Sequence, residues 1–162
     1  MVNHISNLND LVVEIEACMG LHNNSRELLI REAFVVWYML SEGAACEQYS
    51  EKDLLRLLKR NFDTYQQSYS NDIDYSFITG WMMQAAFWHF RTTFDETYGN
   101  QLLWKAYRNV PGNSLFKWSV RQDLQLNERE VSRLQQDICG QFEQYYNYGP
   151  LIRDYFMRVV RG

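Results

Sequence analysis

The stretch YSFITGWMMQAAFWHF, residues 75–90, decides the fold of this 162-residue chain. Its apolar and aromatic side chains fall at almost every angle of a helical projection, which is typical of a helix enclosed by protein. Other elements must therefore pack around this segment. A second helix is expected over residues 97–110, where Pro111 and Gly112 end it, and a third begins at Ser114.

Helical periodicity continues on both sides of this central region. Three pairs have the spacing of a capping box, in which two side chains satisfy free backbone N–H groups: Asn24 with Glu27, Ser50 with Asp53, and Asn127 with Glu130. The other expected starts carry a capping asparagine, Asn113, or an initiating proline, Pro150. The predicted helices cover residues 8–19, 24–41, 50–69, 75–90, 97–110, 114–123, 127–146 and 150–160.

No segment shows the sustained period-two alternation that predicts a half-buried strand. The composition, 46% hydrophobic and 15% aromatic, is that of a chain with a packed core. The sequence therefore predicts an all-α fold, a compact bundle of about eight helices around a buried central helix. At this length, residues 1–162 are expected to form a single domain.

The net charge of −4 is unevenly distributed. Residues 1–100 hold 14 acidic and 7 basic side chains, whereas residues 101–162 hold 6 acidic and 9 basic ones. This balance disfavours a general nucleic-acid binder, which needs a basic surface. The acidic N-terminal part suits either the steering of a basic partner or a solvated surface with no partner, and the sequence leaves both open.

The cysteines and the N-terminus indicate a cytoplasmic protein. Three widely spaced cysteines suit reduced thiols better than a disulfide framework. The first 20 residues lack the basic and apolar regions of a signal peptide. The central helix is too short and too polar to span a bilayer, so no membrane association is expected.

No motif for catalysis, metal binding or a cofactor is present. None of the three histidines stands at helical spacing from another ligand on a clearly shared buried face, and His89 suits a core or boundary position. Cys46 lies beside Glu47, whose charge raises the pKa of a thiol and weakens it as a nucleophile. We therefore expect a protein without catalytic residues, cofactor or metal ion.

Residues 90–111 resemble part of a tetratricopeptide unit, a pair of antiparallel helices that cross at small residues. The matching positions are Phe90, Gly99, Leu103, Ala106 and Pro111. The resemblance implies that Gly99 allows a close approach of the two helices. The opening part of the pattern is missing and only one unit is visible, so a repeat array is not expected.

The runs DIDYSFITGWMMQAAFWHF (72–90) and GNQLLWKAYRNVPGNSLFKWS (99–119) resemble small helical immunity proteins of bacterial contact-dependent growth-inhibition systems. The similarity rests mainly on aromatic residues, which are expected to lie mostly in the core. It implies a protein that neutralises a cognate toxin, for example a nuclease, by stoichiometric binding. A helical-repeat-like adaptor for peptides is the alternative, followed by an enzyme of unrecognised type.

The candidate partner-binding residues are acidic side chains in or beside polar loops: Glu42, Glu47, Asp72, Asp74, Asp95 and Glu96. Acidic groups can occupy the phosphate positions of a nuclease and speed its association. Asp74 and Asp95 also fit the N-cap of the helix that follows each. A cluster of Tyr145, Tyr146 and Tyr148 is the second candidate surface, and monomer and dimer both stay open.

Overall fold

The computed structural model describes residues 12–13, 15–17, 25–43, 48–90, 95–145 and 149–162, without the side chains of 142–145. Residues 12–13 and 15–17 are helical, inside the helix expected over 8–19. The elements that follow are α2 (Arg26–Ser41), α3 (Glu51–Thr64), the π-helical turn η1 (Tyr65–Tyr69), α4 (Ile73–Ala86), the 3₁₀ turn η2 (Phe87–His89), α5 (Tyr98–Asn109), α6 (Ser114–Ser119), α7 (Glu128–Tyr145) and α8 (Pro150–Arg161). The described residues contain no strand, and the predicted all-α class is confirmed.

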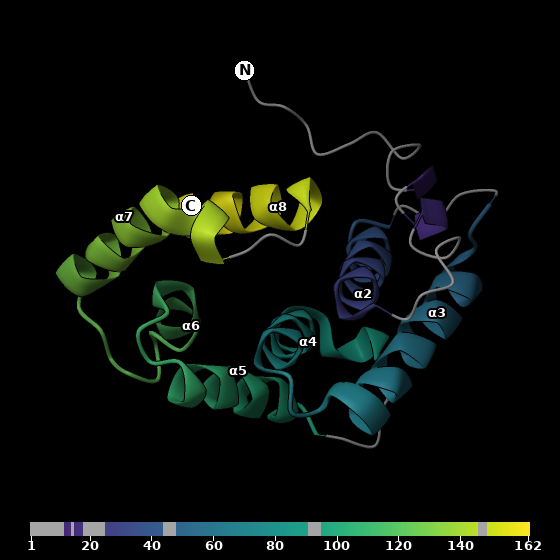
Figure 1. Ribbon diagram of the computed structural model, residues 1–162, viewed down its shortest axis with the longest axis horizontal. Coiled ribbons are helices and arrows are strands. Elements are labelled where there is room, and N and C mark those ends of the chain that lie inside the picture. Colours follow the sequence, from purple (N-terminus) through teal and green to yellow (C-terminus); the bar gives the residue numbers. More distant parts are fainter. Residues whose placement is uncertain (1–11, 14, 18–24, 44–47, 91–94, 146–148) are drawn as a thin grey trace.

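Helix α4 lies between α2 and α5 and is the centre of the fold (Figure 1). Phe77 in α4 is fully buried, and its ring contacts Phe116 of α6 at 4.7 Å and Phe156 of α8 at 5.7 Å between centroids. Helix α8 also packs on α2, where the rings of Phe34 and Tyr155 meet edge to face at 5.1 Å. Elements distant in sequence therefore enclose α4, as expected for a helix that is apolar on most sides.

Two of the predicted capping boxes are confirmed. The Ser50 hydroxyl accepts from the Asp53 N–H at 3.2 Å, and Asp53 accepts from the Ser50 N–H at 3.3 Å. Asn127 and Glu130 make the same reciprocal pair at 3.0 and 2.9 Å. These contacts join residues only three positions apart, so local sequence is sufficient to predict them.

The other expected starts are confirmed with one shift. Asn113 accepts from the N–H groups of the next helix, and Pro150 begins α8. Ser25, rather than Asn24, is the N-cap of α2, since its hydroxyl accepts from the Leu28 N–H at 3.3 Å. Asn24 itself lies outside the described residues.

Both ends of the central helix differ from the prediction of residues 75–90. Helix α4 begins at Ile73, because Asp72 is its N-cap and accepts from the Tyr75 N–H at 2.8 Å. It ends at Ala86, whose backbone angles (φ −154°, ψ 63°) leave the helical region. The 3₁₀ turn that follows leaves Trp88 68% exposed, so Trp88 is an exception to the expectation that the aromatic residues lie mostly in the core.

Two other predicted helices change character before their expected ends. The segment predicted as one helix over 50–69 is α-helical to Thr64 and continues as the wider π-helical turn. The helix expected over 114–123 ends at Ser119 and gives way to turns. Among the described helices none combines the length and apolar character needed to cross a membrane.

Helices α4 and α5 cross in close contact at Gly80 and Gly99. A Cβ atom on Gly80 would lie 2.8 Å from Leu102 Cβ and 2.9 Å from the Gly99 carbonyl oxygen. A Cβ atom on Gly99 would lie 2.9 Å from the Gln84 nitrogen. The expected role of Gly99 in a close helix approach is confirmed, and Gly80 is its counterpart on α4.

Replacing these glycines by alanine is expected to destabilise the fold by about 1–3 kcal/mol, because backbone atoms block the added methyl group. Helix propensity alone would favour alanine by about 0.5–1 kcal/mol. Gly140→Ala in α7 is the control, since a Cβ atom on Gly140 would meet nothing within 4 Å, and this variant should gain stability. Urea unfolding checks the sign; Gly80→Ala and Gly99→Ala variants as stable as Gly140→Ala would contradict the close crossing.

Candidate functional site

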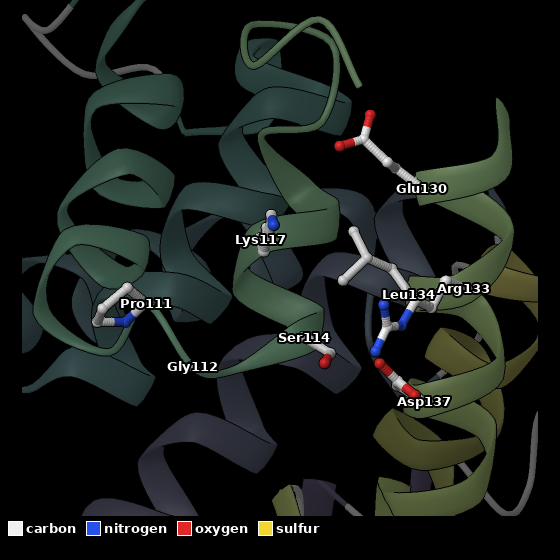
Figure 2. Close-up of a pocket in the computed structure, with 8 residues that line it drawn as sticks. All are labelled: Pro111, Gly112, Ser114, Lys117, Glu130, Arg133, Leu134 and Asp137. Atoms are coloured by element: carbon white, nitrogen blue, oxygen red, sulfur yellow. The ribbon is translucent and has the colours of Figure 1, made fainter. Parts of the chain in front are cut away.

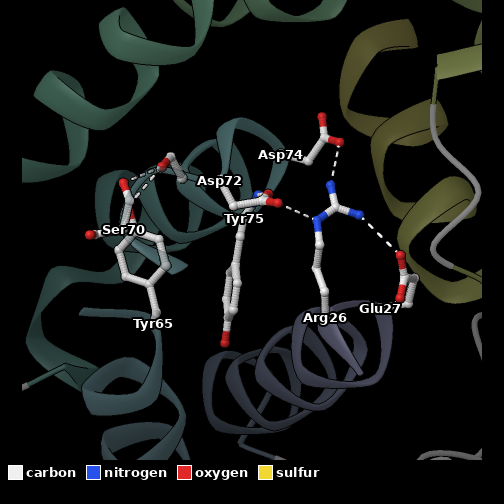
Figure 3. Close-up of polar contacts among 8 residues, drawn as sticks. Arg26, Glu27, Tyr65, Ser70, Asp72, Asp74 and Tyr75 are labelled. Carbon is white, nitrogen blue, oxygen red and sulfur yellow. Dashed lines mark hydrogen bonds and ion pairs between the residues drawn. The ribbon is translucent and has the colours of Figure 1, made fainter. Parts of the chain in front are cut away.

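Two of the predicted partner-binding acids, Asp72 and Asp74, meet at Arg26 (Figure 3). The Arg26 side chain reaches from the first turn of α2 to the start of α4. Its Nε pairs with Asp72, and its Nη2 lies 2.6 Å from Asp74 Oδ2. The guanidinium also contacts Glu27 at 3.1 Å. Arg26 therefore joins two helix starts that are more than 40 residues apart in the sequence.

This network changes the interpretation of both acids. The N-cap of α4 is Asp72 and not Asp74, which lies within the first turn. Both carboxylates are partly buried and already face a guanidinium, which reduces the negative charge they present to a partner. Asp72→Lys would remove a cap and an ion pair together, so it is a poor test of partner binding.

Asp95 and Glu96 lie in the exposed turn before α5. One carboxylate oxygen of Asp95 accepts from the Thr97 N–H at 2.9 Å and from the Thr97 hydroxyl at 2.6 Å. The Thr97 hydroxyl, followed by its N–H, holds the pKa of Asp95 below its usual range, so Asp95 stays charged. The N-cap of α5 is Thr97, and Asp95 therefore precedes the cap position it was expected to fill.

The remaining candidates are separate from this turn. Glu42 is exposed at the C-cap of α2, where its backbone N–H donates to the Tyr38 carbonyl at 2.9 Å. Glu47, Tyr146 and Tyr148 lie outside the described residues, as does the side chain of Tyr145. The structure thus places Asp72 and Asp74 at the start of α4, Asp95 and Glu96 before α5, and Glu42 at the C-terminal end of α2.

Sequence reasoning did not find the exposed Trp88, which the structure places at the same end of the α4–α5 hairpin as Asp95 and Glu96. Gly80 meets Leu102 and Gly99 meets Gln84, so α4 and α5 run antiparallel and the residues after α4 share one end with those before α5. We call Trp88, His89, Asp95 and Glu96 the hairpin tip. No strong local signal in the sequence marks Trp88 as exposed, because the run stays apolar past Ala86 to Trp88.

The hairpin tip combines an exposed aromatic ring with acidic side chains. Trp88 is 68% exposed, and its ring lies 5.5 Å from that of His89. Tryptophan is enriched among the residues that dominate binding energy at protein interfaces. In the described residues neither Asp95 nor Glu96 forms an ion pair, so an aromatic ring and two uncompensated carboxylates share this end of the hairpin.

A pocket of about 320 Å³ lies between α7 and the segment that leads into α6 (Figure 2). Its charged lining consists of Lys117, Arg133, Glu130 and Asp137. Glu130 is already used in the cap of α7. Two cations and two anions balance each other, so this lining favours neither a simple anion nor a simple cation, and it contains none of the predicted acids.

The described side chains include no group of three or more His, Cys, Asp or Glu residues arranged to hold a metal ion. Comparisons of the chain with protein-family models, with curated proteins and with solved structures found no match. The fold and the hairpin tip define an all-α protein with an aromatic and acidic surface at one end of its central hairpin.

Proposed function

We propose that this protein is an immunity protein that binds one cognate bacterial toxin, a nuclease domain, and neutralises it by occupying its surface. The observation that carries the proposal is the exposed Trp88 at the same end of the α4–α5 hairpin as the exposed Asp95 and Glu96. The proposal also draws on the resemblance of residues 72–90 and 99–119 to such proteins. It requires no catalytic group, and it places the protein in the cytoplasm, where a nuclease meets nucleic acid.

The chemistry of the hairpin tip suits a basic partner. A nuclease must bind phosphate, so its active-site region is rich in lysine and arginine. Asp95 and Glu96 would pair with such groups and speed association, while the Trp88 ring would fill a pocket in the partner. Asp72 and Asp74 contribute less under this proposal, because Arg26 already offsets their charge.

Protection of cells tests the proposal. A toxin domain encoded beside this gene, in a large secreted protein with a variable C-terminal domain, is produced alone or together with the immunity protein. We expect growth to be restored by the wild-type protein and poorly restored by Trp88→Ala. Equal protection by both proteins would remove the hairpin tip from the interface, and no protection by either would reject this toxin as the partner.

The alternative proposal, a peptide-binding adaptor, rests on the close α4–α5 crossing, which is the geometry of a tetratricopeptide hairpin. Such proteins bind extended peptides along surfaces built from several stacked hairpins. An adaptor would bind a short linear segment of its partner, whereas an immunity protein needs the folded toxin domain. Binding that survives unfolding of the partner would favour the adaptor.

A further inference from the structure

A second pocket, of about 210 Å³, lies where the turn after α6 meets α4 and α5. Trp81 and Gln84 of α4, Asn100 and Leu103 of α5, and Arg121 and Asp123 of the turn contribute to its lining. None of these residues lines the pocket beside α7. The second pocket also shares no residue with the hairpin tip, so a ligand here is independent of the proposed toxin interface.

Arg121 is held in a fixed position on a stack of two aromatic rings. Its guanidinium carbon lies 3.8 Å from the centre of the Trp118 ring, which stacks on Trp81 with 5.8 Å between centroids. One guanidinium N–H group donates to the Trp118 carbonyl at 3.0 Å. These contacts order the side chain before any ligand arrives, which lowers the entropic cost of binding.

No residue that the structure describes forms an ion pair with Arg121. Loss of surrounding water lowers the pKa of Arg121, as expected for a partly buried cation, although a guanidinium stays protonated. Its remaining N–H groups form a planar fork that suits a carboxylate.

Asp123 supplies the opposite charge two residues further along the same turn. Its Oδ2 accepts from Asn100 Nδ2 at 2.9 Å and from Trp104 Nε1 at 2.8 Å, which ties the turn to α5. These bonds keep its pKa below the usual range, so the group is ionised. Within the described residues its other oxygen, Oδ1, has no hydrogen-bond donor.

The backbone of the turn is also fixed. The Leu126 N–H donates to the Arg121 carbonyl at 3.1 Å, and the Gln125 N–H donates to the Gln122 carbonyl at 3.0 Å. Gln125 has a φ of 53°, the left-handed conformation that closes such a turn. The positive and negative groups of the pocket are thus presented at a set separation by one rigid segment.

We propose that this pocket binds a zwitterionic α-amino acid, with the ligand carboxylate on the Arg121 guanidinium and the ligand ammonium on Asp123 Oδ1. A simple anion would be repelled by Asp123 and a simple cation by Arg121, so a ligand that carries both charges is favoured. The pocket volume of about 210 Å³ admits a small amino acid. Trp81 and Leu103 provide apolar surface for its side chain.

The test is a titration of the ¹⁵N-labelled protein with L-alanine, followed through the indole N–H resonances of the tryptophans. We expect saturable shifts for Trp104, which donates to Asp123, and for Trp81 and Trp118, whose rings support Arg121. N-acetyl-L-alanine lacks the ammonium, and the methyl ester lacks the carboxylate. Each should bind at least about tenfold more weakly, the usual effect of losing one charged hydrogen-bonding pair.

Two variants and a matched control complete the experiment. Arg121→Gln and Asp123→Asn should each weaken L-alanine binding by about tenfold or more, and asparagine keeps an oxygen for the bonds from Asn100 and Trp104. Arg108→Gln is the control, because Arg108 also lies over a tryptophan, 5.2 Å from the Trp104 ring centre, but does not line the pocket. Its affinity for L-alanine should equal that of the wild type.

The outcomes separate clearly. Absence of saturable shifts in the wild type at tens of millimolar L-alanine overturns the proposal. So does equal binding of L-alanine and N-acetyl-L-alanine, since the site would then recognise only the carboxylate. Circular dichroism of each variant confirms its helical content, so that a loss of binding is assigned to the pocket and not to unfolding.

Discussion

Phe77→Ala is expected to lower the free energy of unfolding by about 3–5 kcal/mol, the usual cost of removing a fully buried aromatic ring. Phe77 is 0% exposed and packs on Phe116 of α6 and Phe156 of α8, so its loss opens a cavity where three helices meet. Urea unfolding followed by circular dichroism at 222 nm, the standard helical band, measures the change. If this variant also loses toxin binding, the expected cause is loss of the fold, because Phe77 is buried and cannot contact a partner.

Phe87→Ala is the matched control, because it removes the same side chain from the other end of the stretch. Phe87 is only partly buried, as is Trp81. The cost of about 3–5 kcal/mol holds for a fully buried ring, so it applies to neither residue. We expect a clearly smaller loss for Phe87→Ala than for Phe77→Ala. Equal losses, or a stable Phe77→Ala variant, would contradict the position of α4 at the centre of the fold.

Trp88→Ala is expected to weaken binding of the cognate toxin by at least about 2 kcal/mol, which is a factor of about 30 in the dissociation constant. The expected cause is the loss of a large aromatic anchor at the centre of the interface. Because Trp88 is 68% exposed in the free protein, the same change should alter the free energy of unfolding little. Surface plasmon resonance with immobilised toxin domain, paired with urea unfolding, separates these two effects.

Val110→Ala is the control for exposed apolar surface. Val110 is 42% exposed and follows α5 at the opposite end of the hairpin, so its replacement should leave the affinity unchanged. Glu96→Lys tests the charge of the tip and should slow association, with the wild-type rate falling as salt is added. If Trp88→Ala binds as tightly as Val110→Ala and Glu96→Lys associates at the wild-type rate, the hairpin tip is not the interface.

Helix starts and the class of the fold could be predicted because their signals are local. In each capping box, two side chains accept hydrogen bonds from each other's backbone N–H groups, as in Ser50 with Asp53 and Asn127 with Glu130. The two residues of a pair are three positions apart, so the sequence alone identifies them. The end of α4 could not be predicted in this way. The apolar run continues past Ala86 without glycine or proline, so the exposure of Trp88 had no strong local signal.

The Arg26 network shows the other limit of sequence reasoning. Asp72 and Asp74 looked accessible to a partner because nothing close to them in the sequence would neutralise them. Their partner, Arg26, lies 46 and 48 residues earlier and meets them only when α2 packs on α4. Asp95 and Glu96 of the hairpin tip, in contrast, form no ion pair with any residue that the structure describes.

The most direct test of the proposed function is a titration of the toxin nuclease domain with this protein, with residual cleavage of nucleic acid as the readout. The toxin is held far above the dissociation constant, so that added protein is bound completely. Inhibition by occupancy predicts that activity falls in proportion to added protein and ends at about one equivalent. Full inhibition by a small fraction of an equivalent would show catalysis instead, and unchanged cleavage at a large excess would contradict the proposal.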